Sequence, residues 1–199
     1  IGEAKGVMGM TKKSFPQRII TSQPHYGEVV DVDIDTYLAG NILFSNGAIA
    51  SIFTTFDVYY GRGAQARFEV YGTKGTLVVP DPNTFGGPIL LLRPEDQAAA
   101  PKVDPALMRK EAPNFYAGYK EIPLMFDYNE NSRALGLCDM CKAIETGRDW
   151  RANYQQQHHV LEILTSFSKS CEKGEYIPLK TKYYRTAPMQ NNPMHGILD

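Results

Sequence analysis

Two patterns of hydrophobic residues divide the chain. Between residues 34 and 93, apolar and polar residues alternate with period two, which is typical of half-buried β-strands. Asn46-Gly47 separates two of these segments and favours a tight hairpin turn, because both positions of such a turn need a positive φ. The alternation predicts an antiparallel meander with strands at residues 34–44, 48–58, 66–71, 76–79 and 89–93. Shorter extended segments are expected at residues 6–12, 17–21, 120–123 and 176–185, and a surface excursion at 94–114.

After residue 132 the apolar residues follow helical spacing. The first predicted helix begins after Ser132 and ends at Gly147, and the second begins at Asn153 and ends at Gly174. Their apolar stripes are expected to be the packed faces. The stripes comprise Ala134, Leu137, Cys138, Cys141 and Ile144, and then Val160, Leu161, Leu164, Phe167 and Cys171. The predicted fold class is α+β, a large and mostly antiparallel sheet with helices packed on one face and the other face open for oligomerisation.

Composition excludes several classes of protein. The chain has 199 residues, a formal net charge of -1 and 22% charged residues, an ordinary globular profile. This balance argues against a nucleic-acid partner, which would normally need a basic domain. No apolar run approaches the roughly 20 residues of a membrane-spanning helix, so no membrane partner is expected. Three cysteines are too few for a disulfide framework and predict buried, reduced thiols in a cytoplasmic protein.

The residues alone indicate no catalytic group and no metal site. The glycine clusters at residues 61–63 and 86–87 are not followed by a helix that could bind a phosphate. Cys138 and Cys141 have C-x-x-C spacing but no second pair, and His159 is interpreted as a core or rim histidine. The alternating aspartates at 31, 33 and 35 fit a solvated edge, a basic partner, or a calcium site that lacks the usual turn glycine and terminal glutamate.

Six segments, in this order, resemble the C-terminal domain of the glucose-fructose oxidoreductase / inositol dehydrogenase / MocA (Gfo/Idh/MocA) family. The segments are GNILFSNGAIA (40–50), FEVYGTKGTL (68–77), PDPNTFGGP (80–88), NSRALGL (131–137), AIETGR (143–148) and HVLEI (159–163). The resemblance implies a substrate-binding and oligomerisation domain at residues 1–189, with a tail at 190–199.

The family consists of two-domain NAD(P)-dependent oxidoreductases that act on sugars, cyclitols and related polyols. An N-terminal Rossmann domain binds the cofactor and carries the main catalytic lysine. Neither this motif nor the family's second catalytic motif matches this chain, which begins Ile1-Gly2-Glu3. We therefore expect a fragment that is inactive alone, with NAD or NADP bound by the longer parent and not tightly by this chain. The alternative is a stand-alone, non-catalytic binding or interaction domain of the same fold.

The resemblance also directs the choice of substrate contacts. A polyol needs hydrogen-bonding groups and an aromatic ring, and the loops richest in both lie at residues 18–26 and 81–85. We expect Arg18, His25 and Tyr26 to contact substrate, with Asp57 and Asn83 as weaker candidates that can equally cap turns. The alternative for His25 and Tyr26 is that they pack a surface loop or a subunit interface.

The predicted partners are the parent's own Rossmann domain and further copies of the chain. Helices cover one face of a long meander, and the other face keeps large apolar residues that are unfavourable in water. A homo-dimer or tetramer through this face is therefore expected. Its residues are Ile49, Ser51, Phe53 and Thr55 on one strand and Tyr37, Asn41 and Leu43 on the next.

Overall fold

The structure is a computed structural model that describes residues 1–58, 68–81, 86–100, 117–126, 128 and 132–190. It divides the chain into two compact units, the first comprising Ile1–Tyr60 with Asp139–Pro188 and the second Gly61–Cys138 with Met189–Asp199. Both units contain antiparallel strands, and helices are few, which confirms the α+β class.

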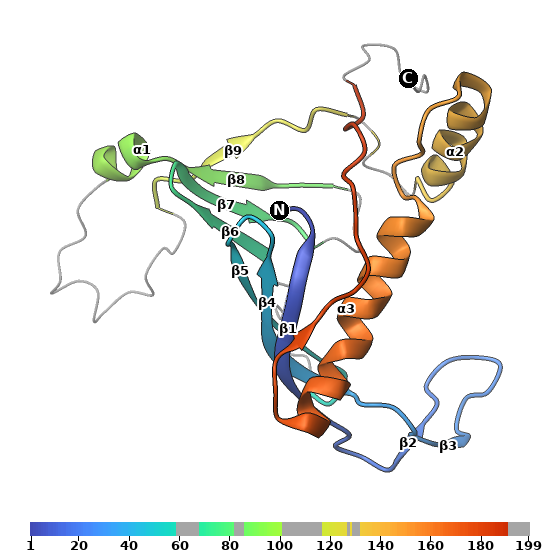
Figure 1. The fold of residues 1–199 in the computed structure, drawn as a ribbon. Coiled ribbons are helices and arrows are strands. Elements are labelled where there is room, and N and C mark those ends of the chain that lie inside the picture. Colours follow the sequence, from blue (N-terminus) through green and yellow to red (C-terminus); the bar gives the residue numbers. More distant parts are fainter. Residues whose placement is uncertain (59–67, 82–85, 101–116, 127, 129–131, 191–199) are drawn as a thin grey trace, which may run out of the picture. The chain divides into compact units, whose positions relative to one another are not determined.

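The first unit is built on a four-stranded antiparallel sheet (Figure 1). Its order is β10 (Ile177–Pro178), β1 (Ala4–Lys12), β4 (Tyr37–Phe44) and β5 (Ile49–Thr55). The hairpin predicted at Asn46-Gly47 forms, but its turn is not the predicted one with a positive φ at both positions, because Gly47 has a φ of 86° and no described non-glycine residue has a positive φ. Asn46 Oδ1 accepts a hydrogen bond from the amide of Ala48 at 3.0 Å. A separate hairpin is formed by β2 (Gln17–Ile19) and β3 (Val29–Asp31), which lie between β1 and β4 in the sequence. The strand β3 was not predicted.

Helix α3 (Tyr154–Lys173) packs closely on one face of this sheet because glycine residues in the strands beneath it have no side chains. Gly9 and Gly40 lie opposite each other on β1 and β4, and the fully buried ring of Phe167 lies over both. A Cβ on Gly40 would lie 2.5 Å from Phe167 Cε1, and one on Gly9 would lie 2.7 Å from Cδ1. Ser170 Oγ accepts a hydrogen bond from the amide of Gly9 at 3.1 Å. The helix therefore packs directly on the main chain.

The ends of α3 agree with the prediction. Asn153 Oδ1 accepts a hydrogen bond from the amide of Gln156 at 2.9 Å, so Asn153 is the N-cap. Gly174 ends the helix in the left-handed conformation with a φ of 68°.

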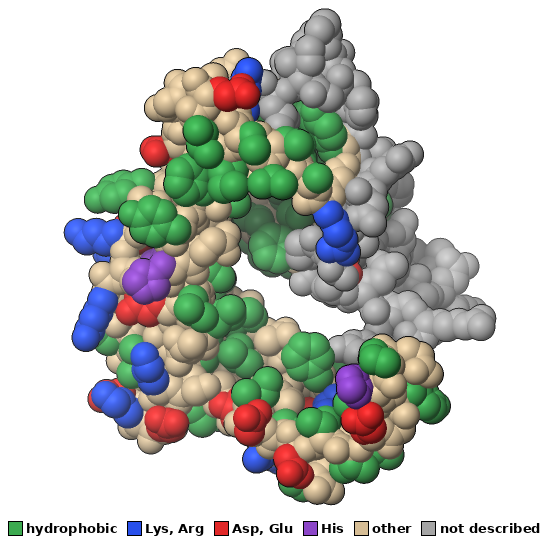
Figure 2. Space-filling model, turned by 90° about the vertical axis from the view of Figure 1, so that its right-hand side faces the viewer, with side chains coloured by type: hydrophobic (Ala, Val, Ile, Leu, Met, Phe, Trp, Pro, Cys, Tyr) green, Lys and Arg blue, Asp and Glu red, His purple; other side chains and the backbone are tan. Residues whose placement is uncertain are grey.

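The predicted packing faces of the helices are wrong, except for Phe167. The side of α3 that is buried carries His159, Ser166, Phe167 and Ser170, whereas Val160, Leu161 and Leu164 are exposed. On α2 (Leu135–Thr146), Asp139 and Ala143 are buried and the predicted apolar stripe is exposed, with Ile144 72% accessible. Figure 2 views the side on which α2 and α3 lie in Figure 1 and shows hydrophobic side chains on the surface there. The close approach of α3 to glycine backbone leaves room for serine, not leucine, at the contact.

The opposite face of the first sheet keeps large apolar side chains in solvent. Met10 on β1 lies opposite Ala39 on β4, which lies opposite Phe53 on β5, so these residues share that face. Met10 is 73% and Phe53 63% exposed, and Phe53 meets Tyr37 edge to face with ring centroids 5.2 Å apart. The prediction of helices on one face and an open second face holds for this sheet.

The second unit contains its own four-stranded antiparallel sheet. The order is β6 (Phe68–Gly72), β7 (Gly75–Val79), β8 (Ile89–Leu92) and β9 (Lys120–Ile122). A short helix, α1 (Pro94–Ala99), follows β8 where a surface excursion was predicted, and the Asp96 carboxylate pairs with Lys120 Nζ of β9 at 2.5 Å. The described strands thus form three sheets instead of one meander, because β6 pairs with β7 and β5 with β4.

Candidate functional site

Two of the predicted substrate contacts, Arg18 and Asp57, lie side by side in the first unit. Arg18 Nη2 on β2 donates a hydrogen bond to the carbonyl oxygen of Phe56 at 2.7 Å and forms an ion pair with the Asp57 carboxylate. Thr36 Oγ1 donates to the other Asp57 oxygen at 2.5 Å. The Asp57 side chain is 5% exposed and that of Arg18 35%. The structure therefore brings these two residues, chosen separately from the sequence, into one hydrogen-bonded cluster.

The electrostatics of this cluster keep Asp57 ionised. Hydrogen bonds from Ser14 and Thr36, together with the Arg18 guanidinium, hold the pKa of Asp57 below its ordinary value, although burial acts in the opposite direction. The group is thus a permanent hydrogen-bond acceptor at neutral pH and not a proton donor. Arg18 Nε is buried and has no hydrogen-bond partner among the described residues.

His25 and Tyr26 lie in the loop of the β2–β3 hairpin, and their described contacts do not involve this cluster. His25 Nδ1 lies 2.9 Å from Glu28 Oε1, both side chains are more than 60% exposed, and Tyr26 is 68% exposed. Within the described residues, no hydrogen bond or ion pair links either of them to Arg18 or Asp57. Asn83 lies outside the described residues.

A cavity of about 620 Å³ adjoins the cluster in the same unit. Ser14, which hydrogen-bonds Asp57, is part of its wall, together with Lys12 and Tyr37. The rest of the wall comes from β1 and the end of α3, and consists of Met8, Gly9, Met10, Thr11, Ser170, Cys171 and Gly174. Sequence reasoning missed Lys12, Ser14 and Tyr37, because each is an ordinary residue of a strand or strand end and nothing in its sequence context marks it.

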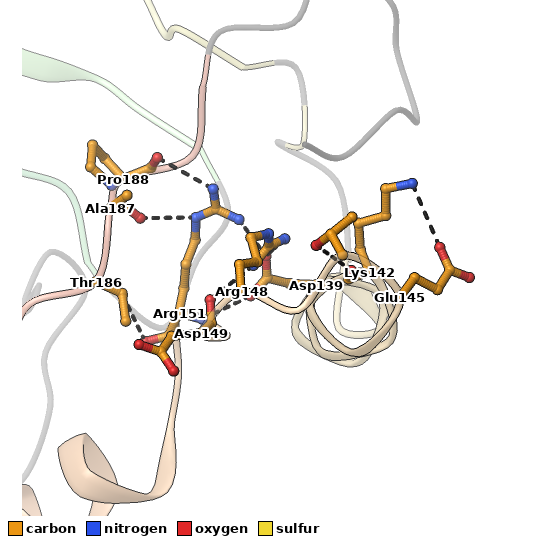
Figure 3. Close-up of polar contacts among 10 residues, drawn as sticks. Asp139, Lys142, Glu145, Arg148, Asp149, Arg151, Thr186, Ala187 and Pro188 are labelled. Atoms are coloured by element: carbon orange, nitrogen blue, oxygen red, sulfur yellow. Dashed lines mark hydrogen bonds and ion pairs between the residues drawn. The ribbon is translucent and has the colours of Figure 1, made fainter.

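A second buried carboxylate, Asp139 of α2, ties three segments together (Figure 3). Asp139 Oδ1 pairs with the guanidinium groups of Arg148, at 2.8 Å, and Arg151, and Oδ2 accepts the Arg151 amide at 2.8 Å. Arg151 also donates to the carbonyl oxygens of Ala187 at 3.2 Å and Pro188 at 3.3 Å. Burial alone would raise the pKa of Asp139, but the hydrogen bonds that its carboxylate accepts from Arg151 and Arg148 outweigh burial and lower the pKa. The cluster connects α2, the segment between α2 and α3, and the C-terminal segment, and its role is structural.

His159 has a structural role as well, which agrees with its interpretation as a core histidine. Its ring is buried, Nε2 accepts the amide of Ala4 at 3.0 Å, and Nδ1 lies 2.8 Å from Thr181 Oγ1. Thr181 in turn donates to Glu162 at 2.5 Å. Both nitrogens of His159 are therefore engaged, and neither is open to a metal.

The described part of the chain contains no group of three or more His, Cys, Asp or Glu residues that could hold a metal ion. The three cysteines are not disulfide-bonded, as predicted, but all are exposed, so the expectation of buried thiols is wrong. Cys138 and Cys141 are on the outer side of α2 because Asp139 and Ala143 occupy the inner side. Among the described helices, none is long and apolar enough to cross a membrane.

Comparison with known proteins agrees with the fold. A family model described as the GFO/IDH/MocA C-terminal domain matches residues 1–78, which confirms the resemblance predicted from the sequence. Levoglucosan dehydrogenase, solved with NADH and L-sorbose, is 21% identical with a TM-score of 0.64, over 91% of this chain and 46% of its own. An oxidoreductase domain protein from Kribbella flavida is 17% identical with a TM-score of 0.62, over 90% and 45%.

Aldose-aldose oxidoreductase from Caulobacter crescentus, solved with glycerol, is 16% identical with a TM-score of 0.52, over 89% of this chain and 42% of its own. The chain thus spans less than half the length of these three structures. At these identities the likeness establishes the fold. A search of curated protein sequences gives no match.

Proposed function

We propose that this chain is the substrate-binding and assembly half of an NAD(P)-dependent oxidoreductase that acts on a sugar, cyclitol or related polyol. The proposal starts from the match of residues 1–78 to the GFO/IDH/MocA C-terminal domain. The observation that carries the proposal is this family match together with the fold shared over 91% of the chain with levoglucosan dehydrogenase. In the parent, a preceding Rossmann domain binds NAD or NADP. Three thiols without disulfides support a cytoplasmic location.

The Arg18–Asp57 cluster and its cavity supply the chemistry for a polyol. The ionised Asp57 carboxylate is a hydrogen-bond acceptor, and the Ser14 hydroxyl, which donates to Asp57, can accept a hydrogen bond from a substrate hydroxyl. The ring of Tyr37 in the cavity wall suits the apolar face of a sugar ring. His25 and Tyr26 are further proposed contacts, and the exposed His25–Glu28 pair equally fits a surface or interface loop. Asn83 stays a candidate from the sequence alone.

Cofactor binding tests the proposed division of labour. Calorimetric titration of this chain with NADH and NADPH is expected to give no micromolar binding, because its described elements include no strand–glycine turn–helix unit that could bind the pyrophosphate. The parent protein is expected to bind one of the two. Micromolar binding by this chain, or none by the parent, would contradict the proposal, and the second result would favour a non-catalytic binding domain.

Kinetics of the parent enzyme test the substrate contacts. Arg18→Ala and His25→Ala are expected to lower kcat/KM at least about tenfold, which corresponds to about 1.4 kcal/mol of lost transition-state stabilisation. Lys13→Ala is the matched control, since Lys13 lies nearby in sequence and its Nζ donates to the Val32 carbonyl oxygen at the surface. If both variants keep the parental kcat/KM, the loop is structural and the assignment of these residues is wrong.

A further inference from the structure

The β2–β3 hairpin of the first unit stands apart from the four-stranded sheet (Figure 1). β2 and β3 pair with each other, and among the described strands neither pairs with a third. Ile19 and Val29 lie opposite each other in this hairpin, and Ile19 is 65% and Val29 61% exposed. A two-stranded hairpin is marginally stable by itself in water. Residues 17–31, called the arm below, therefore gain stability when another body covers them.

The tip of the arm, residues 20–28, presents an aromatic ring and a carboxylate to solvent. Its described backbone hydrogen bonds stay within the arm, since the amide of Ile20 donates to the carbonyl oxygen of Glu28 at 2.9 Å and that of Gly27 to Ile20 at 2.8 Å. Tyr26 is exposed, and the exposed Glu28 carboxylate meets the ring of His25, which is charged only when it is protonated. The tip thus offers a ring and a negative charge that its own chain leaves uncovered.

The cavity beside β1 has properties that match this tip. Met8 and Met10 supply flexible thioether side chains, which adapt to an aromatic ring and make favourable contacts with it. Lys12 is the only charged residue among those described in the wall, and within the described chain no ion pair neutralises it. An apolar hollow with one cation therefore complements a tip with one ring and one carboxylate.

The position of the cavity favours a second copy of this chain as the source of the tip. Met10 and Tyr37 belong both to the cavity wall and to the open sheet face, which is the proposed contact between copies. The arm begins at Gln17, shortly after Lys12 of the wall, so every copy carries an arm and a cavity near the same end of β1. One two-fold contact can then cover both arms and fill both cavities.

We infer that the arm of each copy reaches into the cavity of a second copy, where Tyr26 of the partner subunit packs on Met8 and Met10 and Glu28 of the partner subunit pairs with Lys12. The exchange brings Tyr26 of the partner subunit to the candidate site. It accounts for the separation, within one chain, of Tyr26 from the Arg18–Asp57 cluster. The contact between copies stands on its own, whereas the delivery of Tyr26 to a substrate rests on the proposed function.

Cross-linking of cysteines tests the contact between copies. Cys138→Ser and Cys141→Ser leave Cys171 of the cavity wall as the only thiol, and Tyr26→Cys adds a second thiol at the tip. A short bis-maleimide is expected to give a covalent dimer in which position 26 of one copy is linked to Cys171 of the other. Peptide mass spectrometry of mixed isotope-labelled and unlabelled protein identifies the link as one between copies.

Asn46→Cys in the same background is the matched control. Asn46 is exposed and follows the end of β4 that lies farthest from Tyr37 and the cavity. Its yield of dimer is expected to be at least about tenfold lower, because docked thiols react at an effective concentration that random collisions do not reach. A link between position 26 and Cys171 of the same chain, or a yield no higher than that of the control, overturns the inference.

Mixed oligomers of the parent protein test whether Tyr26 acts on the site of the other subunit. Tyr26→Ala and Ser14→Ala are each expected to lower kcat/KM at least about fivefold. A purified dimer with one subunit of each variant has one site in which both residues are intact, so we expect about half the parental kcat. A mixed dimer no more active than the two single variants shows that Tyr26 acts within its own chain and overturns the inference.

The outcomes separate this inference from the proposed function. An unchanged kcat/KM for Tyr26→Ala overturns the delivery of Tyr26 across the interface, even where the parent binds NADH or NADPH. An unchanged kcat/KM for Ser14→Ala refutes the cavity as the substrate site, and the contact between copies then stands or falls by the cross-link. A parent that binds neither cofactor refutes the proposed function, whereas a dimer linked through position 26 and Cys171 still supports the exchanged arm.

Discussion

Replacing Phe167 with alanine tests how α3 is held on the sheet. Phe167 is the largest fully buried side chain in the described part of the chain, and it packs against backbone at Gly9 and Gly40. A Phe→Ala change in a core costs about 3–5 kcal/mol, and the cost rises with the cavity that remains. Neither glycine has a side chain that could fill the space. We therefore expect Phe167→Ala to lower the free energy of unfolding by about 4–5 kcal/mol. This is a large part of the roughly 5–15 kcal/mol by which a typical protein is stable.

Urea unfolding of this chain, followed by circular dichroism, measures the loss. With a slope of about 2 kcal/mol per molar urea, the midpoint is expected to fall by about 2 M. Leu164→Ala on the same helix is the matched control, since Leu164 is half exposed, and we expect it to cost below about 1 kcal/mol. A loss below about 1.5 kcal/mol for Phe167→Ala, or equal losses for the two variants, would refute this account of the packing.

The features predicted correctly from the sequence are those that one residue can determine. Asn46-Gly47 closes a hairpin and Asn153 and Gly174 bound a helix, because a positive φ or a side-chain cap is a local requirement. These requirements hold whatever the element packs against. The β4–β5 hairpin and the two ends of α3 followed from them, whereas β3 did not.

The packed side of α3 is not a local property, which is why the apolar stripe was misleading. Gly9 and Gly40 lie 31 positions apart, and their meaning appears when β1 and β4 are paired in the register that sets them opposite each other. A helix then packs on bare backbone through serine and one phenylalanine. The apolar residues Val160, Leu161 and Leu164 lie outside this contact and are exposed in the described part of the chain. Hydrophobic periodicity indicates that one face of a helix is apolar, but it does not indicate which part of a protein covers that face.

The contacts of the candidate site residues are likewise set by the tertiary fold. Arg18 and Asp57 were chosen as polar residues of loops, and the fold pairs them across 39 positions of sequence. The pairing depends on β2 reaching the end of β5, which no sequence pattern indicates. Ser14 and Tyr37 join them through the cavity, and the tertiary fold alone marks these two residues.

Two further predictions concern assembly and acid. Light scattering at micromolar concentration is expected to show a dimer or tetramer for this chain, and a monomer for Met10→Glu, because the substitution buries a charge in the open sheet face; a monomeric unmodified chain would reject the interface. The second prediction concerns Asp139, whose pKa is lowered in the folded state by hydrogen bonds from Arg151 and Arg148 that outweigh its burial. A carboxylate with a depressed folded pKa contributes stability above its unfolded pKa of about 3.9, and that contribution is lost as pH falls through the lower folded pKa. Asp139→Asn is therefore expected to be less stable than the unmodified chain at pH 7, with the difference shrinking below about pH 4. Asp57 and Glu162 also have lowered pKa values, but they titrate in both proteins and cancel in the comparison. Chemical unfolding at a series of pH values measures the difference, and a gap that stays constant down to pH 3 would show that the charge of Asp139 does not stabilise the fold.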